Sequence, residues 1–124
     1  MPPPPNPEII NDRAKLLSHR LIARQLSTDP DLIVRARRVI TEWRSMGQQY
    51  DFLDEWDRLL RLDPAQLRRL ITQRSESMTR LRISSPLGLA SDLFTDDEAL
   101  RRRIRWKAKN GLLLAAKRKA DAAA

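Results

Sequence analysis

The 124-residue chain has no cysteine, a single histidine and only three glycines. Without cysteine it can form neither disulfides nor thiolate metal sites, and a metal site would depend on carboxylates alone. Its glycines are isolated, so they cannot form a glycine-rich phosphate loop. The sequence therefore predicts no metal and no cofactor.

Long apolar runs are also missing from the chain. The longest, residues 112–116, is far shorter than the ~20 residues that a membrane-spanning helix needs. The first residues, MPPPPNPE, show no basic segment followed by an apolar one, so a signal peptide is not expected. We therefore expect a cytoplasmic protein that does not contact membranes.

Leucine, arginine and alanine are abundant, and all three favour helices. Apolar residues recur at helical spacing after typical helix starts, in which a capping side chain often precedes a proline. The expected helices span residues 7–27 after Asn6, from Pro30 to Gly47 after Asp29, 51–61 with Asp51 as cap, and two shorter segments that start after Asp63 and at Ser75. Within the second helix the apolar stripe includes Trp43 and Met46. The sequence thus predicts an all-α fold, a compact bundle of five to six short helices with a basic C-terminal helix.

The helical pattern also predicts how the chain is divided. Residues 1–6 form a disordered proline-rich lead-in, and residues 7–119 form one helical domain. Within it we expect a body (7–82), an ordered loop (83–94) and a basic helix (95–119), with residues 120–124 frayed. The expected anchors of the loop are Leu87, Leu89, Leu93 and Phe94. A capping box from Thr95 to Glu98 opens the last helix, and Asn110-Gly111 favours a kink or stop within it.

Positive charge is concentrated in the second half of the chain. Residues 1–63 carry ten Lys/Arg and ten Asp/Glu, whereas residues 64–124 carry fourteen and six, which accounts for the whole net charge of +8. Nine of these cations follow Glu98 without an intervening acid: Arg101, Arg102, Arg103, Arg105, Lys107, Lys109, Lys117, Arg118 and Lys119. This segment is expected to bind an anionic partner, either nucleic acid or an acidic protein surface.

The last predicted helix presents two faces. Leu100, Ile104 and Ala108 follow one another at four-residue spacing and should pack on the body. Trp106 lies about 200° around the helix from Ile104, and Leu113 extends the same side. Trp106 is either an anchor for a partner, as tryptophan often is at interfaces, or is covered by the domain or by arginine side chains. Trp43 and Trp56, in contrast, lie on apolar stripes and are expected in the core.

No combination of residues indicates catalysis. His19 has no acidic residue one helical turn away, and Ser84 and Ser85 have no base nearby in sequence. The acids of residues 51–63 are better explained as solvated charges on a helix face than as paired catalytic carboxylates. We therefore expect no enzymatic activity.

Residues 80–87, Arg-Leu-Arg-Ile-Ser-Ser-Pro-Leu, with the segment from Trp56 to Phe94, resemble small helical proteins of bacterial toxin–antitoxin modules. The resemblance implies a protein that masks a toxin and often binds its own operator DNA. On this reading Ser84, Ser85, Pro86 and Leu87, together with Trp106 and Leu113, contact a toxin-like partner. The basic C-terminal segment departs from many antitoxins, in which the toxin-binding segment is acidic.

Two other functions are compatible with the same sequence. The first is a nucleic-acid-binding regulator or accessory protein that acts through the basic C-terminal helix, mainly by contacts to the phosphate backbone. A helix-turn-helix on residues 51–73 would support it only weakly, because the turn has no glycine and the second helix is short. The second is a structural subunit of a larger assembly.

Overall fold

The computed structural model describes residues 6–48, 50–93 and 97–123, and within these ranges every regular element is a helix. The helices are α1 (Pro7–Thr28), α2 (Asp31–Ser45), α3 (Asp51–Leu60), α4 (Pro64–Ile71), α5 (Glu76–Ile83), α6 (Pro86–Ala90) and α7 (Glu98–Ala123). The all-α prediction is confirmed, with one short helix more than expected. Residues 1–5 of the predicted lead-in (1–6), the anchor Phe94, the cap Thr95 and the last residue, Ala124, lie outside the described residues.

The side chains predicted to start helices do so at three positions. Asn6 accepts a hydrogen bond from the backbone N–H of Glu8 at 2.8 Å, and Asp63 accepts one from Ala65 at 3.0 Å. Ser75 caps α5 by accepting from the Met78 N–H. Each bond satisfies a backbone donor that the first turn of a helix leaves unpaired.

Two of the predicted caps are wrong. α2 begins one residue later than expected, with Pro30 in the capping position, and the carboxylate of Asp29 instead pairs with Arg35 at 2.8 Å. Asp51 is the first residue of α3, whereas the cap is Tyr50, which makes no capping side-chain bond. In both cases the acid lies within one residue of the observed capping position, where the positive end of the helix dipole still favours a negative charge.

Gly47 ends α2 as predicted. It has a φ of 85°, which glycine adopts without strain. The N–H of Gly47 donates to the Arg44 carbonyl, and that of Gln48 donates to the Trp43 carbonyl. This pair of bonds is a Schellman motif, and it satisfies the last carbonyl groups of the helix.

The core lies between α1 and the short helices that follow it. Trp56 is fully buried there, and its indole N–H donates to the Leu81 carbonyl at 3.0 Å, so the prediction for Trp56 is confirmed. Trp43 is only half-buried but packs against the same cluster. Met46, predicted on the same stripe as Trp43, is 68% exposed because α2 ends at Ser45.

The predicted loop of residues 83–94 contains a helix, α6, and this is a correction. Ser85 accepts a hydrogen bond from the Leu87 N–H, and Pro86 occupies the first helical position. Of the predicted anchors, Leu87 is fully buried, whereas Leu89 is 66% exposed and Leu93 is exposed as well. Ser-Ser-Pro therefore starts a new helix here as well as ending the previous one.

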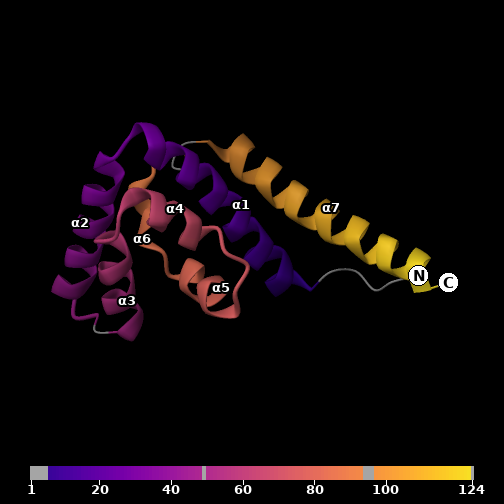
Figure 1. Ribbon diagram of the computed structural model, residues 1–124, viewed down its shortest axis with the longest axis horizontal. Helices are drawn as coiled ribbons and strands as arrows, with labels where there is room; N and C mark the ends of the chain where they lie inside the picture. The colour runs from indigo at the N-terminus through magenta and orange to yellow at the C-terminus, as the bar shows by residue number, and fades with distance from the viewer. Residues whose placement is uncertain (1–5, 49, 94–96, 124) are drawn as a thin grey trace.

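α1 is the central element of the fold. The body helices α4, α5 and α6 pack along one side of it, and α7 runs antiparallel along another (Figure 1). α2 packs on α6 and α3 at the far end of the body. α7 is continuous from Glu98 to Ala123, so the kink or stop expected at Asn110-Gly111 and the frayed tail expected from residue 120 are not observed in the described residues.

Candidate functional site

The first half of α7 is held against α1 by the face that the sequence predicted. Ile104 and Ala108 are buried, and Leu100 is half-buried. At the start of the helix, the Asp97 carboxylate accepts a hydrogen bond from the Leu100 N–H at 2.9 Å. Arg105 adds a bond to Asn11 of α1 at 2.7 Å. These contacts fix the rotation of α7 and so determine which side chains point away from the body.

Trp106 is one of the side chains that point away, and it is 65% exposed. Leu113, two turns further along the same side, is 36% exposed, and Leu114 is 55% exposed. Of the two sequence-based interpretations of Trp106, coverage by the domain is therefore wrong. The structure leaves a large aromatic ring and two leucines in solvent on one long helix, which we call the outward face of α7 (Trp106, Leu113 and Leu114).

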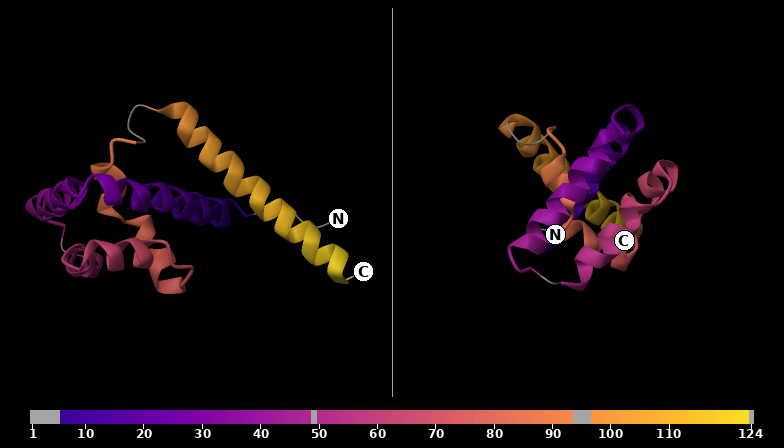
Figure 2. Two further views of the ribbon diagram at one scale, coloured as in Figure 1. Left: turned by 45° about the horizontal axis from the view of Figure 1, so that its top comes forward. Right: turned by 90° about the vertical axis from the view of Figure 1, so that its left-hand side faces the viewer.

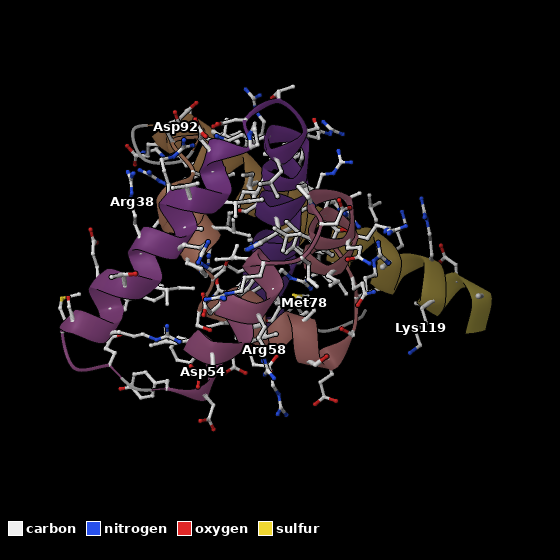
Figure 3. All side chains as sticks on the ribbon, turned by 60° about the vertical axis from the view of Figure 1, so that its left-hand side comes forward. Arg38, Asp54, Arg58, Met78, Asp92 and Lys119 are labelled. Atoms are coloured by element: carbon white, nitrogen blue, oxygen red, sulfur yellow. The ribbon has the colours of Figure 1, made fainter. Side chains whose placement is uncertain are left out.

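The second half of α7 extends beyond the body. In the described part of the helix, no residue after Ala108 is buried. Figure 2 shows this half continuing past the start of α1, and Figure 3 places Lys119 far out along it. Isolated helices of this length are only marginally stable in water. A projecting segment with exposed leucines would therefore gain stability from packing against another molecule.

The nine cations predicted to bind an anionic partner lie along α7, and all are exposed. They are Arg101, Arg102, Arg103, Arg105, Lys107, Lys109, Lys117, Arg118 and Lys119. Arg102 forms an ion pair with Glu98 one turn earlier, at 2.7 Å, and Arg105 bonds to Asn11. An exposed pair of this kind contributes little stability and can exchange for another anion.

The segment Ser84–Leu87 is placed differently from what a partner-binding role requires. Pro86 and Leu87 are buried in the core, and this corrects their assignment as contacts for a partner in this conformation. Ser84 and Ser85 are half-buried, and Ser85 uses its hydroxyl to cap α6. The segment joins α5 to α6 and includes the first two residues of α6, and the structure does not bring it together with Trp106 and Leu113.

Ser85 also meets His19, which lies 66 residues earlier in the chain. The His19 Nε2 atom is 2.8 Å from the Ser85 hydroxyl, and Nδ1 is 2.7 Å from the Lys15 carbonyl. Because a carbonyl can only accept, Nδ1 carries the proton and Nε2 accepts from the Ser85 hydroxyl. The imidazole also stacks on Trp56, with 6.4 Å between ring centroids.

Burial lowers the pKa of His19 from 6.5 to about 4. The hydrogen bond to the Lys15 carbonyl raises the pKa, and the positive charges of Arg82 and Lys15 lower it. A hydroxyl bonded to a neutral imidazole is the arrangement of a nucleophile and its base. Here, however, the ring is only 2% exposed and the hydroxyl oxygen is occupied by a backbone N–H. We interpret the pair as a structural hydrogen bond that links α1 to the junction of α5 and α6. The spacing of the two residues in the sequence could not reveal this contact.

A groove of about 1130 Å³ opens beside the His19–Ser85 hydrogen bond, between α1, α7 and the α5–α6 junction. Its lining combines acids and bases, among them Glu8, Asp12, Lys15, Arg101 and Arg105. In the part of the chain that the structure describes, no group of three or more His, Asp or Glu side chains could hold a metal ion. None of the described helices is both long and apolar enough to cross a membrane.

No protein-family model matches the chain, and no curated protein or solved structure matches it significantly.

Proposed function

We propose that the chain is a non-enzymatic, antitoxin-like protein that binds and neutralises a toxin-like protein partner through α7. The observation that carries this proposal is the outward face of α7, where Trp106 is exposed on a helix that is only half supported by its own domain. Tryptophan is among the residues most enriched at binding hot spots. The resemblance of residues 80–87 to small antitoxin-like proteins supports a toxin-like partner.

The charges around the outward face define the chemistry of the expected partner. Arg102, Lys109 and Lys117 are exposed along α7, and helical spacing places them within about 40° of Trp106 or Leu113. An apolar centre with a cationic rim is complementary to a partner surface with an apolar pocket and an acidic rim.

The experiment compares three forms of the chain, each tagged and purified at low salt from its native host. The first is the wild type, and the second is Trp106→Ala with Leu113→Ala. The third, a matched control, is Met46→Ala with Tyr50→Ala, which removes two apolar side chains that are also well exposed, 68% and 58%, at the far end of the body. We expect a second protein at near-equal amount with the wild type and with the control.

The α7 variant should lose that protein, because truncating a hot-spot residue costs about 2 kcal/mol or more, which is roughly a thirtyfold loss of affinity. Purification of the wild type without a second protein would contradict the proposal. Equal retention by the α7 variant would also contradict it.

A second candidate function is nucleic-acid binding through the cations of α7, favoured by the exposure of all nine. Replacing Arg101, Arg102 and Arg103 by alanine should weaken binding equally for all sequences and make it less dependent on salt. Binding of the wild type that does not change with salt concentration would exclude this function.

A further inference from the structure

A second basic surface lies on the body. The net charges of residues 1–63 and 64–124 do not reveal the segments that form it. Residues 13–28 contain four Lys/Arg and no acid, and residues 64–75 contain three arginines and no acid. The first segment is most of α1, and the second covers α4 and the turn that follows it. Because α4 packs against α1 (Figure 1), two segments without acids lie side by side.

Six arginines of these segments form what we call the arginine face: Arg13, Arg20, Arg24, Arg68, Arg69 and Arg74. On α1, the first three fall within about 40° of one another at 100° per residue, so they share one side of the helix. Arg24 lies opposite Arg68 and Arg69 across a shallow hollow of about 480 Å³. Burial lowers the pKa of Arg13, and the nearby positive charges of Arg74 and Arg20 lower it further.

The arginine face differs from the surface around α3 and α5 in the pairing of its charges. Arg44, Arg58 and Arg61 form ion pairs with acids of α3, and Arg80 pairs with Glu76. Among the described residues, none of the six arginines of the face has an acid within ion-pair distance. Like charges crowded together without counter-charges cost free energy, which a bound anion would recover.

The hollow has the chemistry of a phosphate site. It is lined by Arg24, Arg68 and Arg69, with Ser27 and two alanines, Ala23 and Ala65, between them. Planar guanidinium groups bind phosphate oxygens in pairs of parallel hydrogen bonds. The small side chains between them leave room for a phosphate to approach the guanidinium groups.

The arginine face lacks the apolar contacts that a protein partner requires. None of the large hydrophobic side chains that are exposed in the described residues comes from residues 13–28 or 64–75. Protein interfaces usually have an apolar core, whereas nucleic-acid backbones are bound by charge and hydrogen bonds without an apolar core. From Arg13 to Arg24 the face runs about 16 Å along α1, at 1.5 Å per residue. That length matches about five phosphates of one strand at 3.4 Å each.

We propose that the arginine face binds the phosphodiester backbone of nucleic acid, with one phosphate in the hollow between α1 and α4. This site is separate from the outward face of α7 and from its nine cations, so it does not depend on the partner proposed above. The contacts are to phosphate, so binding is independent of base sequence. A chain bound in this way keeps α7 free for a protein partner.

The test measures fluorescence anisotropy of labelled 24-base-pair duplexes, two DNA sequences and one RNA, between 50 and 200 mM salt. The test variant is Arg24→Gln with Arg69→Gln and Arg74→Gln, three exposed side chains. The control is Arg38→Gln with Arg58→Gln and Arg61→Gln, on α2 and α3. Figure 3 shows Arg38 and Arg58 pointing outward from these helices. Both variants lower the formal net charge from +8 to +5.

We expect the wild type and the control to bind both DNA sequences alike. The test variant should bind roughly 10- to 100-fold more weakly at 0.1 M salt, and its slope of log K against log salt should be shallower by about 2.7, at 0.9 for each phosphate contact removed. Stronger binding of the DNA or of the RNA duplex identifies which backbone the site accepts.

Equal losses in the test variant and the control would overturn the proposal, because net charge alone would explain binding. It would also fail if the wild type bound no duplex, or if only the alanine variant of Arg101, Arg102 and Arg103 lost binding, which would assign the site to α7. Binding of polyglutamate that the test variant loses, with duplex binding unchanged, would show an acidic protein as the ligand.

Discussion

Acid should destabilise the fold through His19, and the structure allows the size of the effect to be worked out. The neutral imidazole donates to the Lys15 carbonyl, accepts from Ser85 and stacks on Trp56. Protonation would place a charge in the core, where burial opposes it, next to the positive charges of Arg82 and Lys15. Ser85 would also have to turn its hydroxyl from donor to acceptor. These effects explain why the pKa is lowered to about 4 in the folded protein.

The sign follows from the two pKa values. In the unfolded chain His19 should titrate near 6.5, so between pH 6.5 and about 4 the unfolded state binds a proton that the folded state does not. The contribution of His19 to stability is therefore complete above pH 6.5 and is lost as the pH falls towards about 4. At 1.36 kcal/mol per unit, the loss amounts to about 3 kcal/mol.

Two measurements check this prediction. His19 is the only histidine, so its ring protons give a single NMR titration, with an expected midpoint near pH 4. Urea unfolding at several pH values between 7.5 and 4.5 should show a loss of free energy in the wild type that a His19→Gln variant lacks. The variant corrects for carboxylates that titrate in the same range. An NMR midpoint of 6 or higher, or the same pH dependence in both proteins, would refute the reasoning.

Three further predictions concern stability, measured by urea unfolding. Trp106→Ala should change the free energy of unfolding by no more than about 0.5 kcal/mol, because the ring is in solvent. Trp56→Ala should lower the free energy of unfolding by about 3–5 kcal/mol, because that ring is buried. Similar losses in the two variants would contradict the placement of the two rings. Gly111→Ala should increase the helical signal at 222 nm and stabilise α7 by about 1 kcal/mol, because the added methyl group meets nothing within 4 Å. The same change at Gly47, with its φ of 85°, should destabilise the protein. Stabilisation by both changes would contradict the left-handed conformation of Gly47. Arg82→Ala should cost about 3 kcal/mol, since the buried guanidinium donates to the carbonyls at positions 71 and 73; a loss below 1 kcal/mol would contradict this role.

Most of the helices could be predicted because their signals are local. A capping side chain, a proline and apolar residues at helical spacing lie within one or two turns, so the sequence predicts helix starts at Asn6, Asp63 and Ser75. α6 is not predicted, although Ser85-Pro86 carries the same signal. Gly88 and the preceding serines indicate a loop. A helix of five residues is too short to show apolar residues at helical spacing, which would have indicated a helix instead.

The parts of the candidate sites that depend on contacts between distant segments could not be predicted. His19 and Ser85 are 66 residues apart, and only the packing of α1 on the α5–α6 junction brings them together. Arg24 and Arg69 belong to two helices whose proximity no local pattern encodes. The zero net charge of residues 1–63 also conceals the part of the arginine face that lies on α1, since four of the ten acids that balance the charge lie in α3.

The proposal of an antitoxin-like role is tested most directly by growth of cells that express the co-purified partner. We predict that the partner alone arrests growth and that co-expression of the wild-type chain restores it. The Trp106→Ala, Leu113→Ala variant, present at the same level, should not restore growth. A partner that leaves growth unchanged when expressed alone, or rescue by the variant as complete as by the wild type, would contradict the account.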